Sequence, residues 1–265
     1  MKHKYGMEAR FVMAALLAAT AFCALDASAQ GIDEQPSVTP YRPSVSTPAA
    51  LSAPGWIEVE VGLTHARGEA RARRDSSPYT VKLAFTDDWG VRVGGDAWVR
   101  QRDELGQHLS GGGDTSVVLK RRFGIDEASA FGLELGATVP TGRAGIGTGK
   151  SDYSLNGIYS ADLGGYHTDL NLVATRVGRV DPGTSRGQLL WAASLSRALS
   201  DRWGVGAELS GTRQRGVEGT AQVLGAASYN VSKSLTLDAG FSRSIRGGAD
   251  WSVFTGFTAL VGRLF

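Results

Sequence analysis

From residue 56 to the C-terminus the chain repeats short segments in which apolar and polar residues alternate with a period of two. In the first segment, Ile57, Val59 and Val61 would share one face, with Glu58 and Glu60 on the other. Successive side chains of a β-strand point to opposite faces, so this pattern predicts strands. Twelve such segments, each long enough to cross a bilayer as a tilted strand, cover residues 56–66, 79–86, 90–101, 114–123, 129–139, 152–162, 165–177, 187–198, 203–213, 219–230, 235–245 and 250–265.

Alternation alone does not distinguish a soluble β-sandwich, with its apolar face inward, from a membrane barrel with that face outward. Connection lengths favour the barrel, because long and short connections alternate, as outer loops and periplasmic turns do. We therefore predict an all-β fold, a single antiparallel transmembrane β-barrel of about 12 strands over residues 55–265, with both termini periplasmic. The long connections are 67–78, 102–113, 140–151 and 178–186, and the short ones are 87–89, 124–128, 163–164, 199–202 and 231–234.

The N-terminus predicts export. Basic residues at Lys2, Lys4 and Arg10 precede an apolar stretch over residues 11–25, and the small residues at 27–29 match a signal peptidase site. We expect cleavage between Ala29 and Gln30, which makes residues 1–29 a signal peptide. The mature chain would then be exported, and its predicted barrel places it in the bacterial outer membrane. Cleavage also removes Cys23, the single cysteine of the chain, so no disulfide or thiolate metal site is expected.

Residues 30–54 contain five prolines among Ser, Thr and Val. This composition predicts a disordered periplasmic tail or linker. A plug that enters the barrel is the alternative.

Aromatic residues at the strand ends add support for a membrane location. Trp89 and Trp203 follow short connections, where interfacial aromatic girdles lie. The chain ends on Phe265, which follows an amphipathic final segment. A terminal Phe of this kind is expected to be the signal that the barrel-assembly machinery reads. Arg263 departs from the otherwise apolar face of that segment.

Three stretches carry a resemblance to a known family. The chain reads GDTSVVLKRRF from residue 113, GATVPTGRAGIGTGKSDYSL over 136–155 and NLVATRVG over 171–178. This succession resembles the outer-membrane family described as "putative MetA-pathway of phenol degradation", whose members are often named transporters. The resemblance implies a pore-like barrel, related in role to channels for hydrophobic compounds. The family name records a genomic association, so phenol is not taken as the substrate.

The polar face of the predicted strands carries charges of both signs. Two interpretations are open: a water-filled pore whose charges set selectivity, or a narrow lumen closed by ion pairs. We favour the pore. The residues predicted to line the lumen are Glu58, Glu60, Lys82, Arg92, Asp96, Arg100, Lys120, Arg122, Glu134, His167, Asp169, Asn171, Glu208 and Asp238.

Other chemistry is poorly supported. Residues 142–151 end on Gly-Lys-Ser like a phosphate-binding loop, but the alternating strand that follows replaces the required helix. A lipid hydrolase would need a His and a Ser on the lipid-facing side, whereas His167 falls on the polar face. The histidines are scattered, so neither a metal nor another cofactor is expected. Arg71, Arg73 and Arg74 lie in the first outer loop, where they could contact lipopolysaccharide or simply be solvated.

Charge argues against nucleic acid as a partner. The chain has 28 Lys and Arg against 26 Asp and Glu, and loss of residues 1–29, which hold three basic and two acidic residues, leaves a net charge of +1. The expected partners are outer-membrane lipid, lipopolysaccharide and an unknown solute. We expect a passive pore for small molecules, aromatic or otherwise hydrophobic ones among them, without a catalytic residue. A closed structural or surface-interaction barrel and a lipid hydrolase are the alternatives.

Overall fold

A computed structural model describes residues 35–68, 72–103 and 105–265. The predicted signal peptide, its cleavage site at Ala29 and Gln30, and Arg71 lie outside these residues. Within the described ranges, no helix is long and apolar enough to cross a membrane.

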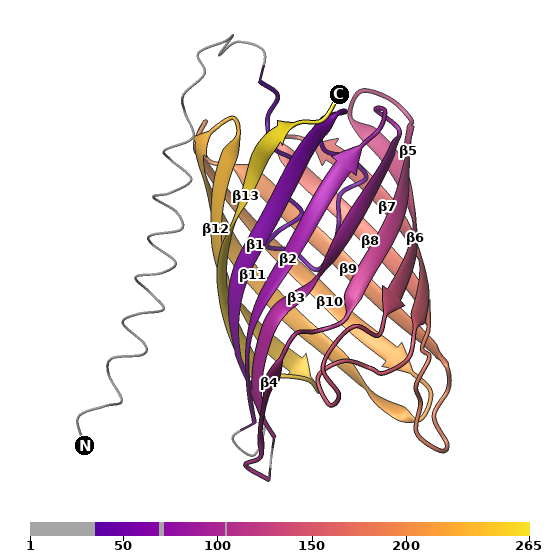
Figure 1. The fold of residues 1–265 in the computed structure, drawn as a ribbon. Helices are drawn as coiled ribbons and strands as arrows, with labels where there is room; N and C mark the ends of the chain where they lie inside the picture. Colours follow the sequence, from indigo (N-terminus) through magenta and orange to yellow (C-terminus); the bar gives the residue numbers. More distant parts are fainter. Residues whose placement is uncertain (1–34, 69–71, 104) are drawn as a thin grey trace, which may run out of the picture. The chain divides into compact units, whose positions relative to one another are not determined.

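The strands form one closed antiparallel barrel (Figure 1). Each strand pairs with the next along the chain, and β1 pairs with β13 to close the ring. The exception is the short β4, which pairs only with the end of β3, so the ring itself has the predicted twelve strands. The strands are β1 (Trp56–Arg67), β2 (Arg73–Ala84), β3 (Trp89–Arg102), β4 (His108–Gly111), β5 (Thr115–Gly124), β6 (Ser129–Val139), β7 (Asp152–Leu163), β8 (Tyr166–Arg176), β9 (Gly187–Ala198), β10 (Trp203–Gln214), β11 (Val217–Ser232), β12 (Leu235–Arg246) and β13 (Trp251–Arg263).

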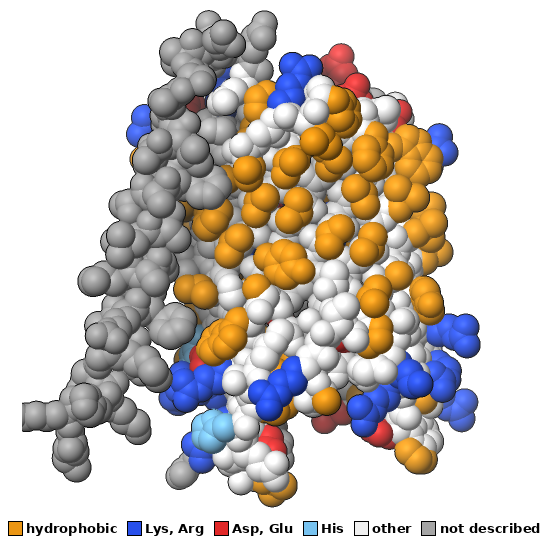
Figure 2. Space-filling view, viewed as in Figure 1, with side chains coloured by type: hydrophobic (Ala, Val, Ile, Leu, Met, Phe, Trp, Pro, Cys, Tyr) orange, Lys and Arg blue, Asp and Glu red, His pale blue; other side chains and the backbone are white. Residues whose placement is uncertain are grey.

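In the barrel wall, apolar side chains face outward and polar side chains face inward, which is the reverse of a soluble protein. Outward positions are apolar and exposed, with Leu135 at 56% and Leu172 at 55% of full exposure, whereas the inward Glu58 is 0% and Lys120 is 2% exposed. Figure 2 shows this apolar surface as a broad region between more strongly charged ends. A surface of this kind is stable against lipid rather than water, which decides between the barrel and the sandwich.

The two ends of the barrel differ in their connections. We call the end at which Gly55 and the C-terminus meet the turn end; it carries the short connections 85–88, 125–128, 164–165, 199–202 and 233–234. The opposite end, the loop end, carries the longer connections 103–114, 140–151 and 177–186. At the turn end, Gly164 and Gly165 have φ angles of +59° and +84°, the conformation that a two-residue hairpin turn requires.

Aromatic side chains face outward near the turn end. Trp203 is 51% exposed and packs against Tyr229 with ring centroids 4.9 Å apart. Trp89 is 38% exposed and lies 5.0 Å from the guanidinium of Arg121. Phe265 is 59% exposed, and its role as an assembly signal stays a prediction.

A β-bulge in β3 corrects one expectation. Ser77 of β2 pairs with Trp98, but the next residue, Pro78, pairs with Asp96, which leaves Ala97 as the extra residue. Proline has no N–H to donate to the ladder, so strands tolerate it at bulges. The extra residue reverses the alternation beyond it.

Because of this reversal, Val99 is buried at 0% exposure, whereas Trp98 is 40% exposed and Arg100 is also exposed. The prediction that Arg100 lines the lumen is therefore wrong.

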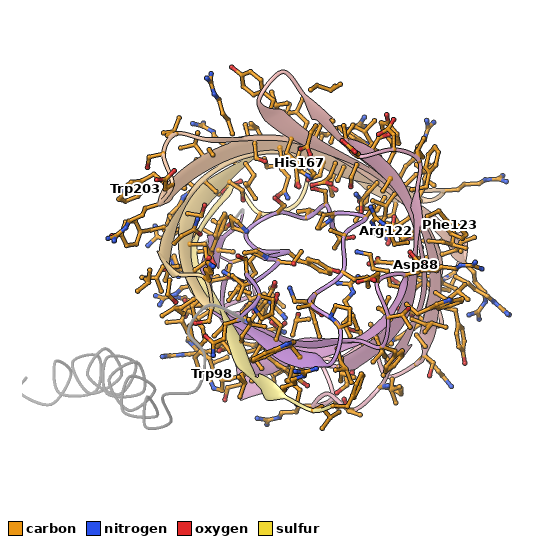
Figure 3. The ribbon with its side chains drawn as sticks, turned by 90° about the horizontal axis from the view of Figure 1, so that it is seen from above. Asp88, Trp98, Arg122, Phe123, His167 and Trp203 are labelled. Atoms are coloured by element: carbon orange, nitrogen blue, oxygen red, sulfur yellow. The ribbon has the colours of Figure 1, made fainter. Side chains whose placement is uncertain are left out.

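The structure also corrects the expectation of an unstructured tail before the barrel. Residues 36–54 belong to the same compact unit as the barrel and cross its interior when the barrel is viewed along its axis (Figure 3). Ser46 and Ala49 of this segment are 1% and 0% exposed. The alternative of a plug is the one that the structure supports, and residues 36–54 are called the plug below.

Candidate functional site

The plug enters and leaves the lumen at the turn end. The backbone N–H of Val38 donates to the carbonyl of Lys233 in the β11–β12 turn, over 2.9 Å. Val45 reaches farthest, since it borders a pocket together with Gly247 and Gly248 of the loop-end connection between β12 and β13. The chain then returns, and the N–H of Gly55 donates to the carbonyl of Ala84 as β1 begins.

Wall carboxylates hold the plug backbone. Glu58 accepts from the N–H of Thr39 over 2.9 Å, and Glu60 accepts from the N–H of Tyr41 over 2.7 Å. Prolines interrupt regular backbone pairing within a segment, and buried N–H groups need acceptors. These acidic side chains therefore bind the plug instead of lining an open channel.

Glu208 holds the tip of the plug. It accepts hydrogen bonds from the N–H of Val45 over 3.2 Å and from both the N–H and the hydroxyl of Ser46 over 2.8 Å each. Glu208 itself is 2% exposed. A single carboxylate on β10 thus satisfies three donors at the turn of the plug.

Two lysines enclose the aromatic ring of Tyr41. The ammonium groups of Lys82 and Lys120 lie 4.0 and 4.4 Å from the ring centroid, a cation–π arrangement. Lys82 forms ion pairs with Glu58 and, over 2.6 Å, with Glu60. The charges on this side of the wall are therefore paired with one another as well as with the plug.

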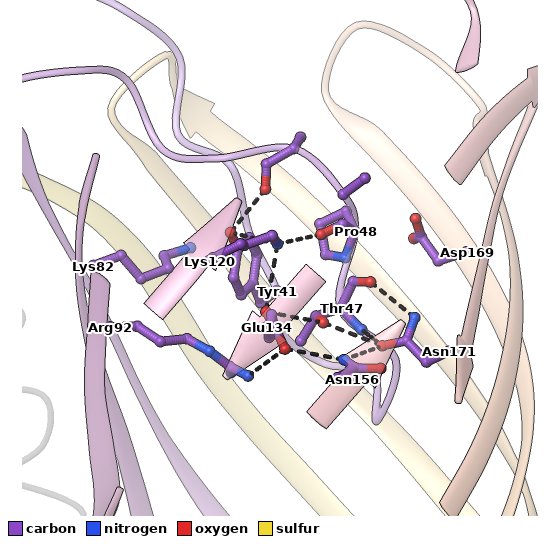
Figure 4. Close-up of polar contacts among 12 residues, drawn as sticks. Tyr41, Thr47, Pro48, Lys82, Arg92, Lys120, Glu134, Asn156, Asp169 and Asn171 are labelled. Atoms are coloured by element: carbon purple, nitrogen blue, oxygen red, sulfur yellow. Dashed lines mark hydrogen bonds and ion pairs between the residues drawn. The ribbon is translucent and has the colours of Figure 1, made fainter. Parts of the chain in front are cut away.

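Glu134 is the centre of a second buried cluster (Figure 4). It accepts from Arg92 over 3.0 Å and from the amide of Asn156 over 2.9 Å, and it lies 3.6 Å from the ammonium of Lys120. Lys120 also donates to the hydroxyl of Tyr41 over 3.0 Å and to the carbonyl of Pro48. Plug and wall thus share one hydrogen-bonded network.

The side chain of Asn171 on β8 both accepts a hydrogen bond from the plug backbone and donates one to it. Its side-chain oxygen accepts from the N–H of Thr47 over 3.1 Å, and its side-chain nitrogen donates to the carbonyl of Thr47 over 2.9 Å. Nearby on β7, the hydroxyl of Ser160 accepts from the N–H of Ala49 over 2.7 Å.

Arg42 anchors the plug to the opposite wall. Its guanidinium lies 3.2 Å from Asp238 and donates to the carbonyl of Thr255 over 3.2 Å. A Cβ atom built on Gly62 would lie 2.4 Å from the guanidinium carbon, and one built on Gly256 would lie 2.6 Å from its Nε. Glycine at these two positions makes room for the arginine against β1 and β13.

The plug leaves space along one side of the lumen. A cavity of about 1140 Å³ lies between the plug and the wall from β8 to β12, and it extends to the turn-end residues Asp201, Arg202 and Lys233. A smaller pocket of about 150 Å³ lies toward the loop end, bordered by Val45. Ser44 and Ser46 border the large cavity, so the tip of the plug, held by Glu208, separates the two spaces.

The lining of the large cavity combines polar and apolar groups, and many of its residues are small. It includes hydroxyl groups, backbone at glycine, and the ion-paired His167, whose Nδ1 lies 2.7 Å from Asp162 and whose Nε2 lies 3.2 Å from Asp169. The inward residues of this wall include Ser194, Ser196, Gly204, Gly206, Ala226, Ser228, Asn230 and Thr236.

The structure places the predicted lumen residues in four groups. Asp96 lies toward the loop end, where it pairs with Arg74 over 2.7 Å. Arg122 and His167 lie on the inner side of the wall near the turn end, as Figure 3 shows, while Phe123 points outward. Arg100 lies on the outer face. The residues that contact the plug or each other around it are Glu58, Glu60, Lys82, Arg92, Lys120, Glu134, Asn171, Glu208 and Asp238. Asp169 contacts Ser160, which in turn accepts a hydrogen bond from the plug.

Sequence reasoning missed the plug side of the site, above all Tyr41, Arg42, Ser46 and Thr47. One signal was available. Glu208 stands on a predicted inner face without a basic residue at inward positions of its own strand. A buried carboxylate without a cation needs hydrogen-bond donors from elsewhere, and the proline-rich segment was the unassigned source.

The family motifs also have a structural explanation at the loop end. Asp114 accepts from the N–H of Gly142 over 2.9 Å and from the N–H and hydroxyl of Thr148 over 2.7 and 3.0 Å. Burial opposes ionisation of Asp114, but the three hydrogen bonds prevail and lower its pKa. The Gly-rich stretch of residues 142–151 is therefore a loop wrapped around a carboxylate and not a phosphate-binding site.

We expect Asp114→Ala to loosen this loop without unfolding the barrel, because local opening needs only the loss of local bonds. Trypsin cleavage after Arg143 or Lys150 should become faster by about an order of magnitude, since each hydrogen bond to a charged group contributes about 1.5–3 kcal/mol. The lowered pKa means that protection is present at neutral pH and is lost as the pH falls through the folded-state pKa of Asp114. Asp126→Ala, in an exposed turn at the other end, is the control. Unchanged cleavage in Asp114→Ala would contradict this role.

These features define a class of protein: a twelve-stranded membrane-type β-barrel whose lumen is partly filled by its own N-terminal segment. Residues 97–252 match the family described as "Putative MetA-pathway of phenol degradation". The chain belongs to this family, as the sequence motifs predicted.

Solved structures share the fold at low sequence identity. The COG4313 outer membrane channel from Pseudomonas putida F1 has a TM-score of 0.62 and 13% identity, over 80% of this chain and 98% of that chain. The KdgM porin in complex with oligogalacturonate has a TM-score of 0.54 and 11% identity, over 77% and 99%. The CymD monoaromatic hydrocarbon channel has a TM-score of 0.51 and 8% identity, over 80% and 90%. No curated protein sequence matches the chain.

Proposed function

We propose that this protein is an outer-membrane pore that lets small molecules diffuse through its lumen, with the plug as its barrier. The observation that carries the proposal is the pair of spaces on either side of the plug tip, one of about 1140 Å³ toward the turn end and one of about 150 Å³ toward the loop end. A small displacement of residues 44–46 would join them. The fold that the chain shares with outer-membrane channels and porins supports the same conclusion.

The residues that line the larger space indicate which class of solute the pore would pass. Serine, threonine and asparagine side chains and the His167 ion pairs border the larger space, so a solute there exchanges water for hydrogen-bonding groups. Aromatic molecules that carry a hydroxyl or carboxyl group fit this lining better than plain hydrocarbons, because a purely apolar solute would leave these polar groups without partners. Small aromatic solutes with a polar group are the cargo that we propose.

A hydrolase is not proposed. A catalytic serine needs a histidine beside it and an acid behind the histidine. Here the carboxylate of Asp169 lies between them, since it contacts both Ser160 and His167. Within the described residues, the imidazole of His167 has hydrogen bonds only to the two carboxylates of Asp162 and Asp169.

Glu208→Ala tests the pore and its barrier together. The substitution removes the acceptor of three plug hydrogen bonds, and bonds to a charged acceptor contribute about 1.5–3 kcal/mol each. We therefore expect the fraction of time spent in a conducting state in planar bilayers to rise at least about tenfold, since 1.4 kcal/mol corresponds to a factor of ten. Glu127→Ala, at an exposed turn-end position, should behave like the parent protein.

Two results would contradict the proposal. Absence of current in the parent protein, in Glu208→Ala and in a variant without the plug would favour the closed structural barrel. A channel that passes sugars but excludes small aromatic acids of the same size would be consistent with the proposed pore. It would contradict the proposed cargo. Liposome swelling with each solute measures this preference.

A further inference from the structure

A row of basic side chains crosses six neighbouring strands on the outer face at the loop end, and five of these strands contribute a basic residue. Arg67 of β1 is directly opposite Arg73 of β2, Arg73 is opposite Arg102 of β3, and Arg102 is opposite His108 of β4. On the other side of Arg67, Trp251 of β13 is opposite both Arg67 and Arg243 of β12. The residues Arg243, Arg67, Arg73, Arg102 and His108 are called the basic row.

Directly opposed residues on neighbouring strands point to the same face. Arg67 and Arg73 alternate in phase with the outward Leu63 and Val81 of their strands. Arg102 follows the bulge, together with the outward Trp98 and Arg100. Without the extra residue at Ala97, Arg100 and Arg102 would point into the lumen, so the bulge is what completes the row on the outer surface.

Such a row is unfavourable by itself, because like charges directly opposite each other on neighbouring strands repel. Among the described residues, only Arg73 of the basic row has a carboxylate within ion-pair distance, that of Asp75 at 3.1 Å, and Asp75 also binds His65 at 2.6 Å. Repulsion of this kind is relieved when an anion binds between the cations.

The row also borders a groove. Arg67, Arg73, Arg100, Arg102 and His108 line a hollow of about 340 Å³ together with Asp75 and Gln101. The guanidinium of Arg67 lies 5.8 Å from the ring of Trp251, which stacks in turn with Phe241 at 6.5 Å. Figure 2 shows basic side chains directly below the apolar surface at this end of the barrel. Groups that can bind an anion are therefore adjacent to an apolar surface.

We propose that the basic row binds the phosphate groups of the glycolipid in the outer leaflet, lipopolysaccharide. Its phosphorylated sugars would lie in the groove among the guanidinium groups, which bind phosphate through paired N–H donors. Its acyl chains would cover the adjacent apolar surface around Leu63, Val81 and Val253, which are exposed at 51%, 38% and 43%. An amphiphile with several phosphates matches both halves of the surface, whereas a soluble anion matches only one.

The test compares lipids that differ only in phosphate, with the full-length protein refolded in detergent without endogenous lipid. Native mass spectrometry measures binding of bisphosphorylated lipid A, of the same lipid after removal of its phosphates, and of sodium phosphate. We expect the phosphorylated lipid to bind at least about tenfold more tightly than the dephosphorylated one, because several basic residues attract the anionic headgroup together. Sodium phosphate at equal concentration should not displace it.

Variants locate the site. Arg67→Gln, Arg73→Gln and Arg102→Gln combined should lose at least about tenfold in affinity for lipid A. The matched control combines Arg121→Gln, Arg197→Gln and Arg202→Gln, which remove the same charge from outward or turn positions at the turn end, where these arginines contact Trp89, Tyr166 and Tyr229. This control should bind within about twofold of the parent protein.

Three outcomes would overturn the proposal: equal affinity for both lipids, an equal loss in the two triple variants, or displacement of lipid A by phosphate alone. The lipid comparison uses the unsubstituted protein, so it decides the matter even if a variant does not fold. Binding in detergent requires no current, so a failed pore and a failed lipid site are distinguishable.

Discussion

Deletion of residues 37–52 is expected to raise the single-channel conductance by roughly an order of magnitude, because the plug occupies a lumen that twelve strands would otherwise leave wide enough for solute. The deletion removes Tyr41, Arg42 and Thr47, and with them the contacts to Glu60, Asp238 and Asn171. These wall groups would then face water, which can solvate them, so the barrel itself should persist. Planar bilayer recordings give the conductance, and heat-dependent migration on a gel reports the folded barrel.

A variant of full length separates loss of the plug from loss of its anchors. Tyr41→Ala with Arg42→Ala keeps the chain in place but removes its two largest anchoring side chains. We expect frequent brief openings of the same size as those of the deletion variant. A folded deletion variant with the conductance of the parent protein would show that the plug is not the barrier.

Glu134→Ala is expected to destabilise the protein by about 3–5 kcal/mol, the usual cost when one partner of a buried ion pair is removed. Glu134 and Lys120 are each 2% exposed, and Arg92 and Asn156 also depend on Glu134 for a partner. The substitution leaves the buried Lys120 and the partly exposed Arg92 without the carboxylate that they share. Urea unfolding in detergent, followed by tryptophan fluorescence, gives the change in free energy.

A double substitution tests the cause. Lys120→Met added to Glu134→Ala removes one of the unpaired cations, so part of the lost stability should return, by about 1–2 kcal/mol. Glu127→Ala, at an exposed turn, should change stability by less than about 0.5 kcal/mol. If Glu134→Ala lowers the free energy of unfolding by less than about 1 kcal/mol, then water reaches this cluster and the plug does not seal the cluster from solvent.

The strands were predictable because their signal is local. Alternation around Lys120 and around Leu170 and Asn171 assigns each side chain to a face, and the predicted segments match the observed strands to within a few residues at most ends. The exception is 79–86, since β2 begins at Arg73. There the run Arg73-Arg74-Asp75-Ser76-Ser77 lacks apolar alternation, so nothing in it distinguishes a strand above the lipid from a loop.

The plug was not predictable in the same way. Pro40, Pro43 and Pro48 suit an irregular segment equally well in solvent and inside a barrel. Only the acceptors on the inner wall distinguish the two, and these come from β1, β6, β8 and β10, which are far apart in the chain.

The sequence by itself therefore determined the barrel, its strand number, the polar inner face and the family, because these depend on alternation and turn residues within short windows. The tertiary structure alone decided that charges at Glu58, Glu134 and Glu208 bind a plug and that Arg100 and Arg102 face outward. The outward arginines depend on the bulge, because one unpaired residue reverses every side chain beyond it. The plug contacts depend on what lies across the lumen, because no local pattern shows which segment fills a space that twelve strands enclose.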